Sequence, residues 1–473
     1  MRKIITFCLL AISSISYSKP LSQSTAQSVA YNYYKNVGKI LSSDDLSLAY
    51  TASNNINGAQ IADFYVFNVV SSAGFIIVSA DDIITPILGF STESAFNTNN
   101  IPPDLSFWLK GYQNSIARGI GNGTNATAEI SEKWNTLLQP ASNGMAAKTT
   151  NNSVLPMVTT MWNQDGIYNA MCPYDYSYQT NVLTGCVATA MAQVMRFWKW
   201  PDTAVGSNSY NSNYGMLQVN YNNSVYSWDS MVINPTHANN YIAKLMYDAG
   251  VSVDMGYGVT ESGSYVTVNE NSVCAQTALQ DYFRYKHTMA AVERYSKTDS
   301  QWVSLLQNEL LAGRPIIYEG SGPQGGHCFV NDGYFQYDHF HFNWGWGGSC
   351  NGYFIINSLT PGNDTFNDQQ AVLINIIPDT PVTIVNTGIE QVRPNDNINI
   401  YPNPAKDEIN IASGTQTITE IHVTDMLGRE VIVNYPLNKQ FITLPVRNLV
   451  PGVYNIQLAT AKGRLSSQIV ITK

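Results

Sequence analysis

Apolar positions in the first quarter of the chain alternate between the spacing of helices and that of strands. Helical spacing runs over residues 26–41 and again over 105–116, where a Pro-Pro-Asp start signal precedes it. Between them, residues 64–70 and 75–79 are strand-like runs joined by a turn-forming segment, which is typical of a hairpin. This pattern predicts a compact α+β unit over residues 19 to about 120.

The segment that follows, residues 119–152, is rich in Gly, Asn, Thr, Ala and Ser. Such a composition predicts an exposed connector that proteases can reach. The α+β unit and this connector together make a first predicted domain over residues 19–150.

Residues 151–379 form the largest predicted domain, in which helical patterns precede strands. A helix from Val187 to Trp198 has one continuous apolar face, and Pro201 stops it. Helices first and strands second indicate an α+β architecture and not a repeated βαβ one. The other expected elements are helices over 238–248 and 300–313, and strands over 315–319, 328–335, 340–344 and 353–357.

The C-terminal part of the chain has a different pattern. Residues 380–396 are polar and irregular, which predicts a linker. Residues 397–473 contain seven short runs of alternating apolar and polar positions, which predict a small all-β sandwich. A carbohydrate- or protein-binding sandwich is one interpretation of this domain, although no aromatic platform supports it.

The N-terminus indicates export. Arg2 and Lys3 precede an apolar run over residues 4–15, and small residues close it before Ser18, so residues 1–18 are predicted to be a secretory signal peptide. No later stretch has the length of a transmembrane helix. A formal net charge of −9 argues against a nucleic acid or an anionic membrane as partner.

The cysteine count indicates at least one free thiol. Cys8 leaves with the signal peptide, so the exported chain keeps five cysteines, an odd number. We expect Cys186 to be the unpaired one. The disulfide state of the other four stays open: Cys172, Cys274, Cys328 and Cys350. Their spacing does not resemble a zinc site, and we expect no metal and no cofactor.

Cys186 has the sequence context of a nucleophile. It lies just before the first turn of the predicted helix, where unpaired N–H groups and the positive end of the helix dipole favour a thiolate. Gly185 precedes it and would let a substrate backbone approach the sulfur. The alternative interpretation is a buried, inert cysteine.

A candidate partner for Cys186 follows about 140 residues later, inside the range of about 130–150 found in papain-like enzymes. This is His327, preceded by Gly325 and Gly326, which leave room on its approach side. A thiolate attacks a carbonyl while an imidazole stabilises the ion pair and protonates the leaving amine. His339 and His341, which alternate on the next predicted strand, are expected to be structural.

Three further residues complete the predicted constellation. The Gln164 side chain and the backbone N–H of the cysteine would donate to the developing oxyanion. The side-chain carbonyl of Asn343 would orient the imidazole. Trp346, together with Trp344, would cover the ring and exclude water.

The motifs resemble a known family. Thr184 to Ala190, Gly326-His327 and the run Asn343-Trp-Gly-Trp-Gly-Gly are similar to those of the streptopain family of bacterial cysteine endopeptidases, in particular its interpain-like members. The resemblance implies a papain-like catalytic domain, and it implies that residues 19–150 are an inhibitory propeptide that the enzyme removes itself. It also implies a preference for bulky apolar side chains at the second position of the substrate.

One loop resembles part of the substrate cleft. Ser262 and Gly263 belong to it, and a plain turn is the alternative interpretation. The motif departs from papain at Val187, where papain-like enzymes have Trp or Tyr after the cysteine. The C-terminal domain resembles the sorting domain of the Bacteroidetes type nine secretion pathway. That resemblance is carried by Tyr401-Pro-Asn-Pro and by the run from Pro451 to Tyr454.

Together these observations predict a secreted, self-activating cysteine endopeptidase zymogen with an α+β fold. Its expected partners are protein or peptide substrates, its own propeptide as an intramolecular inhibitor, and the secretion machinery at the outer cell surface. Two alternatives stay open. One is an acyltransferase or amidase with the same thiol chemistry, and the other is a surface adhesin whose papain-like domain is inactive.

Overall fold

The computed structural model describes residues 20–35, 37, 42–56, 58–70, 73–139, 153–322, 325–336, 338–356, 370–379, 399–412, 417–425, 430–434, 439–460 and 463–472. The predicted signal peptide and the predicted linker lie outside the described residues. The chain divides into two units, Met1–Pro381 and Val382–Lys473, and the division falls within the predicted linker. Each unit is described by itself.

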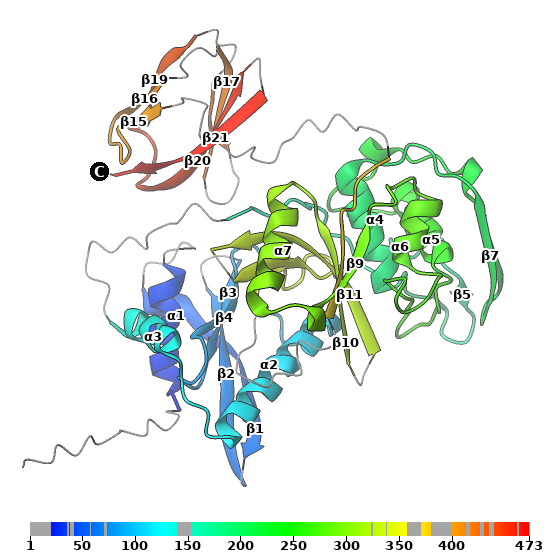
Figure 1. Cartoon of the computed structure of the whole chain (residues 1–473), viewed down its shortest axis with the longest axis horizontal. Helices are drawn as coiled ribbons and strands as arrows, with labels where there is room; N and C mark the ends of the chain where they lie inside the picture. Colours follow the sequence, from blue (N-terminus) through cyan, green and yellow to red (C-terminus); the bar gives the residue numbers. More distant parts are fainter. Residues whose placement is uncertain are drawn as a thin grey trace, which may run out of the picture. The chain divides into compact units, whose positions relative to one another are not determined.

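The first unit is built on one antiparallel sheet of ten strands (Figure 1). Four strands come from the N-terminal segment and six from the predicted peptidase segment. Their order across the sheet is β1 (Leu46–Ile56), β2 (Ala59–Val69), β3 (Phe75–Ser79), β4 (Ile87–Ser91), β13 (Gly352–Ile355), β12 (His339–Asn343), β11 (Gly325–Phe335), β10 (Ile316–Gly322), β14 (Gln370–Ile374) and β9 (Ala290–Glu293).

The N-terminal segment joins this sheet through the pairing of β4 with β13. Phe90 lies opposite Tyr353, and Gly89 lies opposite Phe354. A Cβ at position 89 would lie 2.8 Å from the Phe354 ring and 2.9 Å from the Tyr353 carbonyl oxygen, so only glycine allows the two strands to pair this closely. The predicted boundary near residue 150 therefore separates two segments that share one sheet.

Helices cover both faces of the peptidase half of the sheet (Figure 1). On β10, Ile317 packs against α4, α5 and α6, whereas Ile316 and Tyr318 pack on the opposite side with α2 and α7. This alternation is the period of two expected of a strand that is buried on both faces. The helices are α2 (Pro103–Gly121), α4 (Cys186–Trp198), α5 (Asn240–Ser252), α6 (Ala275–Asp281) and α7 (Asp299–Leu311).

A further core lies between β3 and the pair α1 (Gln23–Tyr34) and α3 (Ala128–Leu138). Helix α3 corrects the prediction of an exposed connector over residues 119–152. Thr127 caps its first turn, and Trp134 is buried and donates its Nε1–H to the Ile84 carbonyl oxygen over 2.7 Å. Ile130 and Leu137 are partly buried and pack against the same core, so three side chains dock the helix. Residues 140–152 lie outside the described residues.

Short elements complete the first unit. Two hairpins pair β5 (Tyr174–Asp175) with β6 (Thr180–Asn181) and β7 (Ser207–Ser212) with β8 (Gly215–Asn220). Four short 3-10 helices are η1 (Ser43–Asp45), η2 (Tyr221–Asn223), η3 (Trp228–Ser230) and η4 (Arg294–Ser296). Within the described ranges, no helix combines the length and the apolar character needed to cross a membrane.

The second unit is the predicted sandwich, and all seven predicted runs are strands. A three-stranded sheet faces a four-stranded one around an aliphatic core that includes Ile411, Ile421 and Ile456. The first sheet has the order β15 (Asn399–Tyr401), β16 (Glu408–Ala412), β19 (Phe441–Pro445). The second has the order β18 (Glu430–Asn434), β17 (Ile418–Asp425), β20 (Gly452–Thr460), β21 (Gly463–Ile471).

Candidate active site

Cys186 is the first residue of α4, directly after Gly185, whose φ is 90°. The Thr184 N–H donates to the Gln164 carbonyl oxygen over 2.9 Å, which fixes the loop that leads into the helix. A side chain at position 185 would be strained in this conformation, and its Cβ would lie 2.6 Å from the Met255 sulfur. Glycine is therefore needed here to begin the helix, and the approach of a substrate backbone past Gly185 stays a prediction.

The electrostatic environment of the half-buried Cys186 favours the thiol. Burial raises the pKa of Cys186 to about 12, and the negative charge of Asp104 acts in the same direction. The N–H groups of Cys328, Val187 and Cys186 itself hydrogen-bond the sulfur and oppose this shift. The predicted stabilisation of a thiolate at the helix start is thus present, but burial and Asp104 outweigh it.

His327 lies on β11 next to Cys328, whose N–H reaches the Cys186 sulfur. The structure therefore brings the two predicted catalytic residues to the same place. The imidazole, however, is held by the N-terminal segment, because its Nδ1 lies 2.8 Å from Asp104 Oδ1. The ring of Phe107, from the same helix α2, lies 5.4 Å from the imidazole.

Asp104 is a site residue that local sequence patterns mark only as part of a helix start. It is 1% exposed in the first turn of α2. Burial raises its pKa, while the hydrogen bond and the charge of His327 lower it. The indole N–H of Trp346 also favours the ionised form, although its geometry falls short of a full hydrogen bond. Trp346 thus lies beside the Asp104–His327 pair.

Asn343 has partners other than the imidazole. Its Oδ1 accepts from Gln193 Nε2 over 3.2 Å and from the Gly345 N–H over 3.1 Å, and its Nδ2 donates to the Thr160 carbonyl oxygen over 2.8 Å. Both acceptor positions of Oδ1 are therefore occupied in this state. The orientation of His327 by Asn343 stays a prediction for the processed enzyme.

Gln164 and Trp344, which were also predicted to lie around the pair, are both buried. Gln164 is 3% exposed in the loop that contacts Thr184, and its role toward an oxyanion stays a prediction. Trp344 is fully buried in the aromatic core and donates to the Cys350 carbonyl oxygen over 3.0 Å. Trp346, and not Trp344, is therefore the indole beside the pair.

The predicted substrate loop lies against the residues that precede Cys186. Ser262 is buried, and its Oγ donates to the Leu183 carbonyl oxygen over 2.8 Å and accepts from the Gly258 N–H over 3.0 Å. Gly263 and Gly326 are exposed. Ser262 thus ties the loop in place. Gly263 pairs its N–H and its carbonyl oxygen with Gly256 over 3.2 and 2.9 Å, and Gly326 pairs with Ser321 in the sheet. Substrate binding by these residues stays a prediction.

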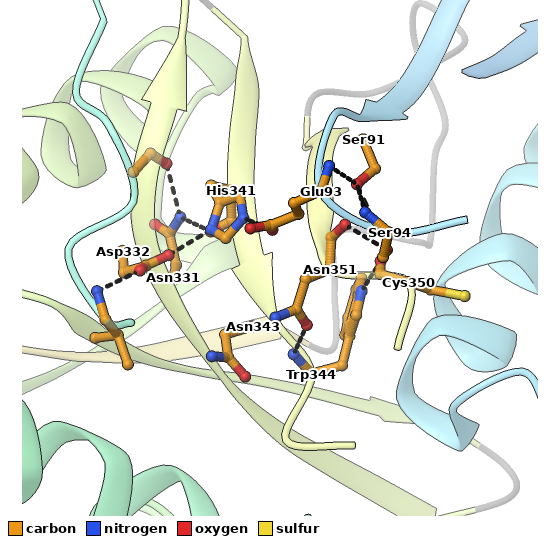
Figure 2. A network of polar contacts seen from close by, with 12 residues as sticks. Ser91, Glu93, Ser94, Asn331, Asp332, His341, Asn343, Trp344, Cys350 and Asn351 are labelled. Carbon is orange, nitrogen blue, oxygen red and sulfur yellow. Dashed lines mark hydrogen bonds and ion pairs between the residues drawn. The ribbon is translucent and has the colours of Figure 1, made fainter. Parts of the chain in front are cut away.

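A second polar contact joins the N-terminal segment to the peptidase strands (Figure 2). His341 lies between two carboxylates, with Nδ1 2.6 Å from Asp332 Oδ1 and Nε2 2.6 Å from Glu93 Oε1. Beside it, Ser94 Oγ donates to the Asn351 carbonyl oxygen over 3.2 Å. The segment after β4 is therefore bound to the loop that follows Asn343, and the expectation that His341 is structural agrees with these contacts.

All five described cysteines are free, including Cys186. Among the residues described, no group of His, Cys, Asp or Glu side chains could hold a metal ion. The positive observation at the site is that one carboxylate of the N-terminal segment, Asp104, acts on both the thiol and the imidazole.

Three known protein families match three separate parts of the chain. Residues 18–116 match the Spi protease inhibitor family, residues 162–354 match the Peptidase C10 family, and residues 399–472 match the secretion system C-terminal sorting domain. These matches confirm the predictions of an inhibitory N-terminal segment, a cysteine peptidase and a C-terminal sorting domain.

The chain is 28% identical to the thiol protease/hemagglutinin PrtT of Porphyromonas gingivalis over 93% of its own length, but it spans only 53% of that protein. A structure of a prointerpain A fragment from Prevotella intermedia, 28% identical, covers 70% of this chain and 100% of that fragment, with a TM-score of 0.56. The predicted fold class is thereby confirmed. The chain is also 30% identical to streptopain of Streptococcus pyogenes and covers 81% of it. It belongs to the peptidase C10 family, the streptopain family of cysteine peptidases.

Proposed function

We propose that this chain is the precursor of a secreted cysteine endopeptidase that activates itself by removing residues 19–150. In the processed enzyme the Cys186 thiolate attacks the scissile carbonyl carbon, and the C–N bond breaks as His327 gives its proton to the leaving amine. Water then attacks the thioester carbon while His327 accepts its proton, and the C–S bond breaks to release the carboxyl product and restore the Cys186 thiolate. Gln164 and the Cys186 N–H face the oxyanion, and Asn343 and Trp346 position the ring.

The observation that carries this proposal is the contact of Asp104 with His327 beside Cys186. One carboxylate on α2 holds the imidazole through Nδ1 and also opposes ionisation of the thiol. Removing the segment that contains α2 takes away this charge and exposes the sulfur. Both changes lower the pKa of Cys186 and free His327 to form the ion pair.

The C-terminal domain determines where the enzyme acts. A secretion sorting domain directs the chain to the outer surface of the cell or to the exterior. The partners of the precursor are then its own propeptide, the secretion machinery, and extracellular proteins or peptides as substrates.

Hydrolysis of casein by the processed protein is the test of this function. Casein should be cut into peptides, and a thiol-reactive peptide inhibitor should label Cys186 in the processed protein much faster than in the precursor. Transfer of an acyl group without hydrolysis would favour the acyltransferase alternative. A processed protein that neither cuts casein nor reacts at Cys186 would favour the inactive adhesin.

Asp104→Asn should weaken latency while keeping the size of the side chain. Asparagine keeps an acceptor oxygen for the imidazole Nδ1–H but carries no charge. A hydrogen bond to a charged group contributes about 1.5–3 kcal/mol and a neutral one about 0.5–1.5 kcal/mol, so loss of the charge should speed processing of the purified precursor by about 5- to 12-fold. The pKa of Cys186 should also fall, because the charge of Asp104 helps to raise it. Intact mass against time and the pH dependence of iodoacetamide labelling measure the two effects.

Asp82→Asn in the same segment is a matched control, since Asp82 lies in the turn before β4 and not at the site. It should process at the wild-type rate. Equal processing and equal labelling of Asp104→Asn and the wild type would contradict the latency role of Asp104.

A further inference from the structure

A row of side chains crosses the peptidase sheet beside the catalytic cysteine. Strand pairing places Cys328 opposite Glu319, Glu319 opposite Ala371, and Ala371 opposite Glu293. Residues paired across antiparallel strands project from the same face of the sheet. This is the face that packs against α4, because Cys328 belongs to that core. The row begins at the active site, since the Cys328 N–H reaches the Cys186 sulfur.

Glu319 is a buried carboxyl group with an incomplete set of partners. It is 7% exposed, and among the residues that the structure describes its Oε2 has no hydrogen-bond partner. Burial raises the pKa of Glu319 to about 9, and the charge of Glu270, a hydrogen bond between the Glu319 and Glu270 side chains, and the charge of Glu293 act in the same direction. The charges that act on this carboxyl group are thus both negative, and neither compensates its ionised form.

The neighbouring carboxylates have other contacts. Glu270 Oε2 accepts from the N–H groups of Val266 and Thr267 over 3.2 and 3.3 Å, and Glu293 Oε1 accepts from Asn269 Nδ2 over 2.9 Å. Glu270 is exposed. It therefore lies nearer to solvent than Glu319.

A cationic group is what this row lacks, since buried carboxylates are normally paired. In the described part of the chain the glutamates do not form a group that could hold a metal ion. An Arg or Lys side chain fits better, because its apolar stem can lie along Ala371 and Cys328 while its charged head reaches Oε2. We propose that Glu319 is the specificity-determining residue of a subsite for a basic side chain of the substrate.

This inference rests on the proposed endopeptidase function and names a substrate class for the same site. It differs from the expectation of a bulky apolar side chain at the second substrate position, which the resemblance to the family implies. The row explains the difference physically. An apolar side chain placed over Glu319 would bury its Oε2 without a partner, whereas a guanidinium would donate to it.

The test uses the processed enzyme and peptides that differ at one position. A casein cleavage site mapped by mass spectrometry supplies the parent peptide, and each of the three residues before the scissile bond is replaced in turn by Arg, Leu or Gln. At one of these positions the wild type should favour Arg over Gln in kcat/KM by about 10- to 100-fold, the range expected for a buried charge-assisted hydrogen bond. Glu319→Gln should remove this ratio.

The ratio should also depend on pH, because a neutral carboxyl group cannot form an ion pair with a guanidinium. Glu319 ionises more as the pH rises toward the raised pKa of about 9, so the Arg-to-Gln ratio of the wild type should increase in that direction. Arginine keeps its charge throughout. In Glu319→Gln the ratio should stay constant with pH, which a merely structural role of Glu319 would not predict.

Asp281→Asn, which removes one exposed charge at the end of α6, is the matched control and should keep the wild-type ratio. Equal kcat/KM for Arg and Gln peptides at all three positions, or an unchanged ratio in Glu319→Gln, would overturn the inference. Failure of the processed wild type to cut casein at all would instead overturn the proposed function. If Glu319→Gln does not process, the ratio and its pH dependence in the wild type decide alone.

Discussion

Cys186→Ala should leave the purified precursor at full length and reduce casein hydrolysis by about a million-fold, as the loss of a catalytic nucleophile does in other proteases. The sulfur is the atom that would bond to the scissile carbonyl carbon, and alanine has no group that could take its place. Wild-type protein should shorten by its propeptide under the same reducing conditions. Intact mass and gel migration over time follow both proteins.

Cys172→Ala provides the matched control. Cys172 is a free, buried thiol, and burial raises its pKa to about 12 as it does for Cys186. Its mutation should leave processing intact, because the sulfur packs in the core around α4, where its hydrogen-bonding side chain is Tyr257. Processing of Cys186→Ala at the wild-type rate, in the absence of any other protease, would exclude Cys186 as the nucleophile.

Helix α4 illustrates what local patterns can establish. Its apolar residues recur on one face and a proline follows, so the sequence places it within one residue of the observed bounds. The strands of the C-terminal sandwich are equally predictable, because one face of each is buried and the other is polar. That Cys186 and His327 lie close together could be predicted, because their separation of about 140 residues falls in the papain-like range.

The contacts between the N-terminal segment and the peptidase segment could not be predicted from local sequence patterns. Asp104 lies in a helix start, where an acidic residue is already favoured by the dipole, so its sequence context shows no second role. Its contact with His327 exists only because α2 packs on the peptidase sheet. Likewise, the join of β4 to β13 depends on pairing between distant segments, which residue spacing does not reveal. Helix α3 was missed because Trp134 is its only fully buried residue.

The contact of His341 with the carboxylates of Asp332 and Glu93 should contribute more to the stability of the precursor than the contact of His327 with Asp104. His341 and Asp332 are almost completely buried, and Asp332 Oδ2 also accepts from the Val158 N–H over 2.7 Å. Burial alone would lower the pKa of His341, but the charges and hydrogen bonds of Asp332 and Glu93 raise it to about 10. The ring of Tyr353 packs against the imidazole at 5.0 Å.

His341→Ala should therefore lower the free energy of unfolding of the first unit by about 3–5 kcal/mol, the cost of leaving a buried charge without its partner. The measurement is urea unfolding of the full chain at pH 6, followed by tryptophan fluorescence, with Cys186→Ala present in every protein to prevent processing. Glu93→Gln should cost about 1 kcal/mol, because water reaches part of this carboxylate and screens it. Glu129→Gln, on the exposed surface of α3, is the matched control and should have no measurable effect.

The sign of the pH dependence follows from the two shifts. The raised pKa of His341 stabilises the precursor fully below about 6.5, its ordinary value, and this contribution is lost as the pH rises toward about 10. Burial alone would raise the pKa of Glu93, but His341 lowers it, so its contribution is present above the ordinary value and is lost in acid. The difference in stability between wild type and Glu93→Gln should thus be largest between about pH 4.5 and 6.5 and shrink toward pH 10.

A difference that does not change with pH would show that Glu93 contributes packing and not charge. In that case the propeptide would be held on this side by the β4–β13 pairing and the contacts of Ser94, and not by the imidazolium.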